Sequence, residues 1–255
     1  LKQKRKKQRH LKQKRKKRIK NNQVFSANIF TLYPEVFPGV LGHGIYARAS
    51  NKNIWKLNVR NIRDYALDKH STVDDKPFGG GNGMVLKADV IDKCLDENSN
   101  NYKTYYLSPR GKVFNQNLAS QISNTKGINL LCGHFEGVDQ RVLDYRKIEE
   151  ISVGDFVLSG GESAAVIILD AVLRLIPGVL GNENSAKDES FSEDLLEYPQ
   201  YTQPRVWNNL EVPSVLLSGN HAEIKDWRLN QSQSITRNLR PDLWSRYISN
   251  KNKKN

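Results

Sequence analysis

The fold is decided by the stretch E-I-S-V-G-D-F-V-L-S-G-G-E-S-A-A-V-I-I-L-D-A-V-L-R-L-I-P-G-V-L-G, residues 150–181. Two short apolar runs, Ile151–Val153 and Phe156–Leu158, precede the turn Ser159-Gly160-Gly161, and a long apolar segment, Ala164–Ile176, follows it. An acid opens that segment and Pro-Gly ends it, as at the two ends of a helix. The stretch predicts a strand, a glycine turn and a buried helix. Such a turn lets backbone N–H groups approach a ligand closely, although a tight turn in any α/β core has the same pattern.

Two similar units precede this stretch. Thr104–Leu107 leads into Ser108-Pro109-Arg110-Gly111, and Ile128–Leu131 leads into the glycine-rich run 132–137. Strands that alternate with helices predict a parallel sheet, and ligands of such sheets bind at the carboxyl ends of the strands. With Phe156–Leu158 as the third strand, three turns gather at one edge and indicate a small-molecule pocket. The helices expected between them are Gln116–Ser123 and Asp139–Tyr145.

The chain before these units predicts a strand over Phe25–Leu32, a helix around Val40–Ser50 and a strand around Trp55–Val59. Residues 42–47 match G-x-G-x-x-A, but prolines interrupt the strand that a dinucleotide site requires in front of it. The glycine-rich span Asp68–Met84 has no G-K-[ST] ending and is not a P-loop. A loop of this kind often covers a site, and a simple surface loop is the alternative.

The net charge of +13 is concentrated at the start of the chain. Residues 1–20 hold 13 of the 40 Lys and Arg residues and no acid, which leaves 27 basic against 27 acidic residues elsewhere. This tail is an imperfect ten-residue duplication with little to bury, so we expect it to be disordered. It either attracts RNA or anionic membrane without sequence preference or is simply solvated.

The cysteine content and the hydropathy of the chain indicate where in the cell the protein works. Cys94 and Cys132 are accompanied by no C-x-x-C and no histidine cluster, which argues against a disulfide framework or a zinc site. No apolar run reaches the length of a membrane span, and nothing resembles a secretory signal. We therefore expect a cytoplasmic protein that has no metal centre and does not enter a membrane.

The composition changes after Gly181, where a polar and acidic span begins. From Val206 the chain is again basic and aromatic, and it predicts a helix over Lys225–Leu239 and another from Pro241. Trp and Arg interleaved on such a helix can stack on bases and pair with phosphates, or simply pack and be solvated. The expected segments are a basic tail (1–24), an α/β domain (25–181), a linker (182–205) and a small helical domain (206–248).

Two other functions agree with parts of the sequence. A serine hydrolase would use Ser163 at the strand-to-helix turn, with Asp170 or Asp188 and with His221. The second glycine of G-x-S-x-G is absent, however, and the histidine lies in the C-terminal segment. A non-catalytic RNA-binding protein would use the tail and the C-terminal helix, but it leaves the three turns without a role.

Several motifs together resemble the bacterial tRNA (guanine-N1-)-methyltransferases, enzymes that methylate the guanosine immediately 3′ of the anticodon. The resemblance extends from about Phe25 to Tyr247. It rests on V-D-D-K-P-F-G-G-G-N-G-M, L-S-P-R-G, C-G-H-F-E-G-V-D-Q-R, S-V-G-D-F-V-L-S-G-G-E, R-L-I-P-G-V-L-G, E-Y-P-Q-Y-T-Q-P and V-P-S-V-L-L-S-G-N-H-A-E-I-K-D-W-R.

The resemblance implies a SPOUT-like α/β domain whose C-terminal part forms a deep trefoil knot, a rare feature of protein chains. It also implies a homodimer with its active site at the interface. The linker and helical domain of the second subunit would hold the tRNA anticodon arm. S-adenosylmethionine would lie bent in the knot, bound mainly by backbone groups. The implied cofactor-binding residues are Ser108, Pro109, Gly111, Gly133, Phe135, Glu136, Gly137, Val153, Gly154, Asp155, Phe156, Val157, Leu158, Gly160 and Gly161.

The resemblance also assigns the catalytic groups. Arg174 matches the family's essential arginine, and Glu189 occupies the position of its general base, usually Asp, with Asp188 as the rival one position earlier. The chain also departs from the family where His134-Phe135 replaces Arg-Tyr and where Ala164 replaces proline. Whether a divalent ion assists the reaction stays open from the sequence.

Overall fold

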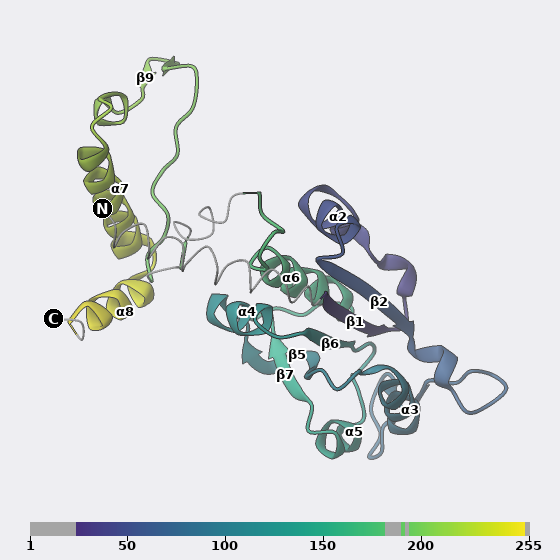
Figure 1. Cartoon of the computed structure of the whole chain (residues 1–255). Helices are drawn as coiled ribbons and strands as arrows, with labels where there is room; N and C mark the ends of the chain where they lie inside the picture. Colours follow the sequence, from purple (N-terminus) through teal and green to yellow (C-terminus); the bar gives the residue numbers. More distant parts are fainter. Residues whose placement is uncertain (1–23, 182–189, 192–193, 253–255) are drawn as a thin grey trace, which may run out of the picture. The chain divides into compact units, whose positions relative to one another are not determined.

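The computed structural model describes residues 24–181, 190–191 and 194–252 (Figure 1). The chain forms two compact units, the first ending at Gly181 and the second beginning at Asn182. None of the helices in these described ranges combines the length and the apolar character needed to cross a membrane.

A five-stranded parallel sheet with the order β2-β1-β6-β5-β7 forms the centre of the first unit. All seven residues of β1 are buried, because the strand lies inside the sheet and helices cover both faces. The parallel sheet expected from the alternation of strands and helices is confirmed. Its strands are β1 (Phe25–Thr31), β2 (Trp55–Asn61), β5 (Thr104–Val113), β6 (Gly127–Cys132) and β7 (Glu149–Ser152).

Two hydrophobic cores lie on opposite faces of the sheet, and Figure 1 shows α6 on one side of it and α3 and α5 on the other. Alternate residues of β1 supply them: Ile29 joins the core under α6, and Phe30 joins the core under α3. The helices are α2 (Gly44–Asn51), α4 (Gln116–Ser123) and α6 (Glu162–Leu173) in the first core, and α3 (Ala88–Asn98) and α5 (Gln140–Tyr145) in the second.

Shorter elements connect these layers. The 3-10 turns η1 (Pro34–Val36), η2 (Gly39–Gly42) and η3 (Ile62–Tyr65) flank α2 and β2. The small hairpin of β3 (Asp74–Asp75) and β4 (Val85–Leu86) carries the glycine-rich span between its strands.

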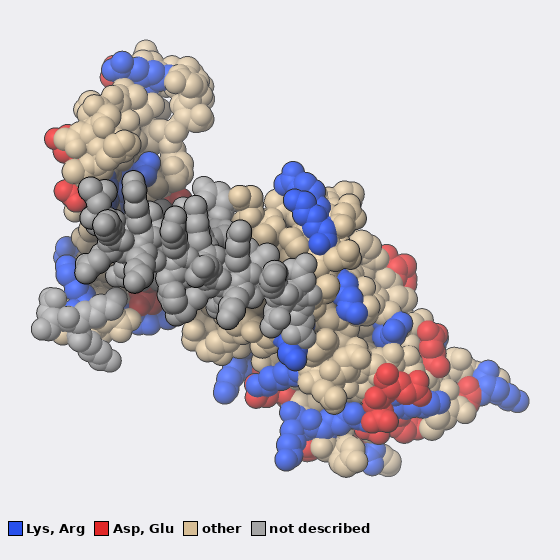
Figure 2. Space-filling model, viewed as in Figure 1, with Lys and Arg blue, Asp and Glu red and all other residues tan. Residues whose placement is uncertain are grey.

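The exposed edge strand β2 carries Lys56 and Arg60, and Arg48 on α2 and Lys52 at its C-terminal cap add two more basic residues. Figure 2 shows basic side chains over these two elements. Charges on an edge strand discourage pairing with the edge of another sheet. The basic residues on this edge therefore protect the sheet from pairing with another sheet, although residues 21–255 as a whole carry no net charge.

One expected strand is wrong. Phe156–Leu158 lies in a loop, and the third strand is β7, which ends at Ser152. Gly154 follows with a φ of 150°, a conformation that takes the chain out of the sheet and favours glycine. Since no further strand of the described chain pairs beyond β7, the apolar run has no ladder to join, and Val157 stays 88% exposed.

The second unit contains the hairpin of β8 (Val206–Trp207) and β9 (Leu210–Glu211), the turn η5 (Ser214–Leu217), and the helices α7 (His221–Leu239) and α8 (Pro241–Asn252). The side chain of Asn220 accepts hydrogen bonds from the first N–H groups of α7, a common N-terminal cap. Residues of the expected linker also contact α7, because Leu196 N donates to Thr236 Oγ1 over 2.8 Å.

Candidate active-site cleft

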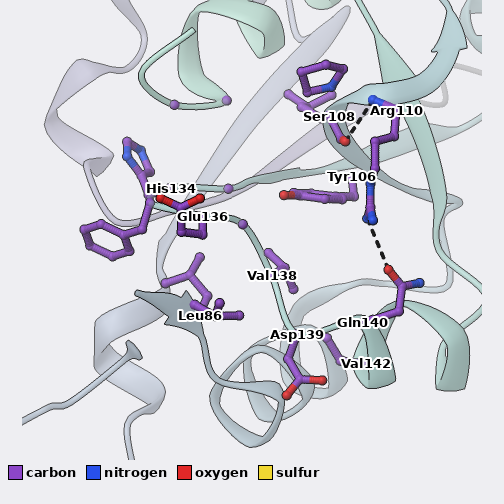
Figure 3. Close-up of a pocket in the computed structure, with 18 of the residues that line it drawn as sticks. Leu86, Tyr106, Ser108, Arg110, His134, Glu136, Val138, Asp139, Gln140 and Val142 are labelled. Atoms are coloured by element: carbon purple, nitrogen blue, oxygen red, sulfur yellow. Dashed lines mark hydrogen bonds between the residues drawn. The ribbon is translucent and has the colours of Figure 1, made fainter. Parts of the chain in front are cut away.

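A cleft of about 1480 Å³ opens at the carboxyl edge of the sheet. It is larger than the roughly 300–1,000 Å³ that is usual for a single small ligand. Segments 108–110, 133–137, 151–154 and 156–161 line it, so the three segments that the sequence predicts at this edge meet there. Figure 3 shows Ser108, His134 and Glu136 around this space.

The first of these segments is not a turn after a strand but an irregularity inside β5. The pairing of β5 with β7 shifts from Leu107 opposite Ile151 to Lys112 opposite Ile151, so Ser108–Gly111 bulges out of the ladder. A Cβ atom on Gly111 would lie 2.3 Å from the backbone of Glu150 and Ile151, which explains the glycine. The bulge brings backbone groups of a central strand to the cleft.

Most of the expected cofactor-binding residues line the cleft. Gly111 and Asp155 do not, because the first is turned toward the β7 backbone and the second is an exposed loop residue. Those that line it are Ser108, Pro109, Gly133, Phe135, Glu136, Gly137, Val153, Gly154, Phe156, Val157, Leu158, Gly160 and Gly161.

The turn after β6 is packed against Tyr106 and against the hairpin. Cβ atoms on Gly133 and Gly137 would lie 2.8 and 3.0 Å from the Tyr106 hydroxyl, so only glycine fits at this distance. Leu86 N donates to Gly137 O over 2.9 Å, and Glu136 N donates to Met84 O over 2.9 Å. Burial raises the pKa of Tyr106, so the phenol that packs against this turn stays neutral.

A buried carboxylate joins two walls of the cleft. Glu162, at the start of α6, accepts hydrogen bonds from Thr31 Oγ1 of β1 and from His134 Nε2, which lies 2.8 and 2.9 Å from its two oxygens. The side chains of His134 and Glu162 are only 12% and 10% exposed. Backbone atoms support the same junction, since Gly161 N donates to Gly133 O. His134 therefore ties the second turn to the third.

We expect Glu162→Ala to lower the free energy of unfolding by about 1–3 kcal/mol, because Thr31 and His134 lose their buried acceptor. Glu162→Gln should be milder, since the amide keeps one acceptor oxygen. Urea unfolding measures both. The control is Glu149→Ala, which removes an exposed pair with Lys103 and should cost no more than about 1 kcal/mol. Equal losses for the two alanine variants would contradict this account.

A second polar group lies at the rim of the cleft. Arg110, on the β5 bulge, donates to both carboxylate oxygens of Glu150 over 3.2 and 3.0 Å and to Gln140 Oε1 over 3.1 Å. Figure 3 shows the bond to Gln140 crossing from the bulge to α5. The Arg110 side chain is 63% exposed, so this cluster positions the rim more than it stabilises the fold.

Of the catalytic candidates, only Arg174 belongs to the described residues, and it does not line the cleft. Arg174 follows α6 as its C-terminal cap, close to Tyr46, whose hydroxyl donates to Asp170. Burial and then the bond to Asp170 raise the pKa of Tyr46, and the positive charge of Arg174 opposes part of that rise. Glu189 and Asp188 lie outside the described residues, as does the basic tail.

The geometry gives little support to a hydrolase. Ser163 makes no hydrogen bond to a histidine of the described chain, His221 belongs to the second unit, and Asp170 accepts a hydrogen bond from Tyr46.

The structure also gives no support to a reactive cysteine. Burial and the adjacent Glu162 raise the pKa of Cys132, so its thiol stays protonated. Within the described ranges no group of three His, Cys, Asp or Glu side chains is placed to hold a metal ion.

Residues 75–78 of the glycine-rich span and residues 85–89 also line the cleft. The sequence left open whether this span covers a site or is a simple surface loop, and it gave no sign of residues 85–89. Their position depends on the β3–β4 hairpin, whose two-residue strands are too short to recognise as a pattern.

The chain is similar to known proteins over nearly its whole length. The family model described as tRNA (Guanine-1)-methyltransferase TrmD matches residues 25–246. A protein of Pelagibacter ubique (strain HTCC1062) named tRNA (guanine-N(1)-)-methyltransferase is 60% identical over 228 residues, which are 89% of this chain and 100% of that protein. Proteins of the same name from Bartonella bacilliformis (53% identical, 90% and 99% covered) and Ehrlichia canis (51% identical, 86% and 95% covered) also match.

Proposed function

Because the chain belongs to the tRNA (guanine-1)-methyltransferase family, it methylates N1 of the guanosine at position 37 of tRNA, and we propose that the cleft of the first unit binds the methyl donor. The single observation that carries this proposal is the meeting of three glycine-rich segments at the carboxyl edge of a parallel sheet. A non-catalytic RNA-binding role would leave that meeting unexplained.

The donor is S-adenosylmethionine, held by backbone groups of Ser108–Gly111, Gly133–Gly137 and Val153–Gly161. The fit rests on the position of these segments around one cleft. Glycine lets them pack there, because added Cβ atoms on Gly133, Gly160 and Gly161 would lie 3.0 Å or less from neighbouring protein atoms. When bound, the donor supplies an activated sulfonium methyl group. The protein has to bring guanine N1 into line with that group, and positioning of this kind can contribute about 7–11 kcal/mol.

Guanine N1 carries a proton at neutral pH, so a base must accept it as the new N–C bond forms. We assign this role to Glu189, with Asp188 as the rival. Arg174 holds the guanine or its neighbour and balances the charge that develops on the base. Arg174 caps the C-terminal end of α6, whereas the turn of Gly160 and Gly161 precedes the other end of this helix, so the match to the family's arginine supports the assignment.

The enzyme acts as a homodimer with its active site at the interface, and the later part of the first unit forms the family's trefoil knot. Exposed apolar side chains support the dimer: Val40 on η2 is 63% exposed and Ile167 on α6 is 48% exposed, on two elements that contact each other. The mass in solution, measured by light scattering, tests it. A monomer that is fully active at the same concentration would exclude it.

The second unit, which includes the expected linker, binds the anticodon arm. A cation and an aromatic ring in contact support this role: the Arg228 guanidinium lies 4.8 Å from the centre of the Tyr198 ring. Arg228 and Trp227 are neighbours on α7. Planar cations and aromatic rings of this kind stack on bases and pair with phosphates. A tRNA substrate also agrees with the cytoplasmic location expected from the sequence.

The test is nucleoside analysis of an anticodon-arm RNA after incubation with the protein and labelled S-adenosylmethionine. The expected product is 1-methylguanosine at position 37. Label in another nucleoside would overturn the assignment of the reaction. Release of acyl product from ester substrates, without RNA methylation, would instead favour the hydrolase.

We expect deletion of residues 1–20 to spare the turnover rate at saturating tRNA. The tail holds 13 basic residues but lies outside the matched region, so it should add only salt-sensitive RNA affinity without sequence preference. RNA binding measured from low to high salt should therefore depend less steeply on salt after the deletion. A large loss of turnover would show that the tail takes part in catalysis.

A further inference from the structure

Phe78 is the most exposed large apolar side chain of the described chain, at 97%, and it lines the cleft. Covering a water-exposed phenyl ring with an apolar surface is favourable, and an exposed ring next to a binding site is therefore suited to contact a ligand. The ring therefore has no structural use in the folded unit and is available to a ligand in the cleft.

The loop that carries Phe78 is fixed at its base. Asp74 and Asp75 pair with Leu86 and Val85 in the β3–β4 hairpin. Beyond Gly83, two backbone hydrogen bonds join the chain to the turn after β6. Glu136 N donates to Met84 O, and Leu86 N donates to Gly137 O. A Cβ atom on Gly83 would lie 2.5 Å from Glu136 Oε1, so this end of the loop is pressed against that turn.

The tip of the same loop is unpacked. Gly79, Gly80 and Gly81 have φ values of 88°, 80° and 128°, a region that favours glycine. Added Cβ atoms on the first two would meet nothing within 4 Å. The loop thus combines an anchored base at the cleft with a tip whose ring is free to settle on a planar ligand.

We propose that Phe78 stacks on the guanine that receives the methyl group and so holds it for transfer. This inference rests on the proposed function. Aromatic rings are the usual platforms for unstacked bases of single-stranded RNA, because every base offers a π face. Lys76, two positions away and also at the cleft, offers a cation for the neighbouring phosphate.

The rival ligand for Phe78 is the adenine of the methyl donor. The donor segments already contain two half-exposed rings, Phe135 and Phe156, both 51% exposed. The loop of Phe78 belongs to none of these segments, and only its base, at residues 83–86, contacts one of them, the turn of residues 136 and 137. Phe78 is therefore left for the second ligand that the reaction requires, the base of the RNA.

The test compares Phe78→Leu, which keeps apolar bulk but removes the π face, with Phe78→Tyr and Phe78→Trp, which keep it. The RNA is an anticodon arm with the fluorescent guanine analogue 6-methylisoxanthopterin at position 37, whose emission falls on stacking. We expect Phe78→Leu to lose the quenching and, on unmodified RNA, to lose about 10-fold or more in kcat/KM. Donor affinity, measured by calorimetry, should not change. The tyrosine and tryptophan variants should restore both readouts.

The control is Leu67→Ala, which removes an apolar side chain that is 64% exposed in the same unit but does not line the cleft. It should leave quenching and kcat/KM unchanged. The proposal is wrong if Phe78→Leu weakens donor binding but keeps the quenching, which would place the ring on the donor, or if it changes neither. A wild-type protein that forms no 1-methylguanosine would instead refute the proposed function itself.

Discussion

Replacing Gly161 by alanine is expected to abolish donor binding and to lower the melting temperature. A Cβ atom at this position would lie 2.6 Å from Cys132 Cα and 3.2 Å from Gly133 N. These neighbours belong to the backbone at the end of β6, so they cannot move aside as a flexible side chain would. The methyl must separate α6 from β6, which overpacks the core at a cost of about 1–3 kcal/mol.

The same separation breaks the junction between two donor-binding segments. The 3.1 Å hydrogen bond from Gly161 N to Gly133 O holds the second turn to the third. Because this separation displaces backbone groups of both turns from the cleft, donor binding should be lost. Calorimetric titration with S-adenosylmethionine and thermal unfolding measure the two effects.

The matched control for this substitution is Gly181→Ala. An added Cβ atom there meets nothing within 4 Å and the backbone conformation suits any residue, so both measurements should stay at the wild-type level. If Gly161→Ala binds the donor as tightly as Gly181→Ala, the junction of the two turns is not part of the donor site.

The regular elements were the most predictable part of this fold. Gln116–Ser123 is a helix with the bounds expected from the sequence, because its apolar spacing and the Asn115 cap are local signals. The Ser108–Gly111 bulge and the loop at Phe156–Leu158 were not predictable, since both depend on where β7 ends beside β5. Pairing between distant strands leaves no periodic trace in either segment.

The candidate site also has parts that could be predicted from the sequence and parts that could not. Glycine-rich turns after strands are local patterns, so the lining around Gly133 and Gly160 could be expected from the sequence. The pairing of His134 with Glu162 joins residues 28 positions apart, and nothing in the sequence marked either as a partner of the other. Phe78 reaches the cleft only through the β3–β4 hairpin, which pairs two strands of two residues each.

Glu189→Gln is expected to lower the single-turnover rate of methylation by about 10²–10⁴-fold, the usual contribution of a general base. The glutamine keeps the size of the side chain and can still accept a hydrogen bond, but it cannot take the proton from guanine N1. Saturating donor and RNA in a rapid-quench experiment isolate the chemical step from binding and product release.

The residues that follow Glu189 are held in a defined turn of the second unit. Ser190 Oγ accepts a hydrogen bond from Glu197 N over 3.0 Å, and Phe191 N donates to Leu195 O over 2.8 Å. These bonds order the residues that directly follow the proposed base in the sequence. Glutamate adds one methylene to the family's aspartate, and a displacement of about 1 Å in a positioned group can cost on the order of 10²-fold in rate.

Asp188 is the rival because it has the family's residue type one position earlier. Asp188→Asn should therefore be close to wild type if Glu189 is the base. Asp194→Asn is the control for a general loss of negative charge, since this carboxylate is engaged by the Asn250 side chain in the same unit. If Asp188→Asn abolishes methylation while Glu189→Gln retains it, the assignment is reversed: the aspartate takes the proton, and the glutamate only fills the position next to it.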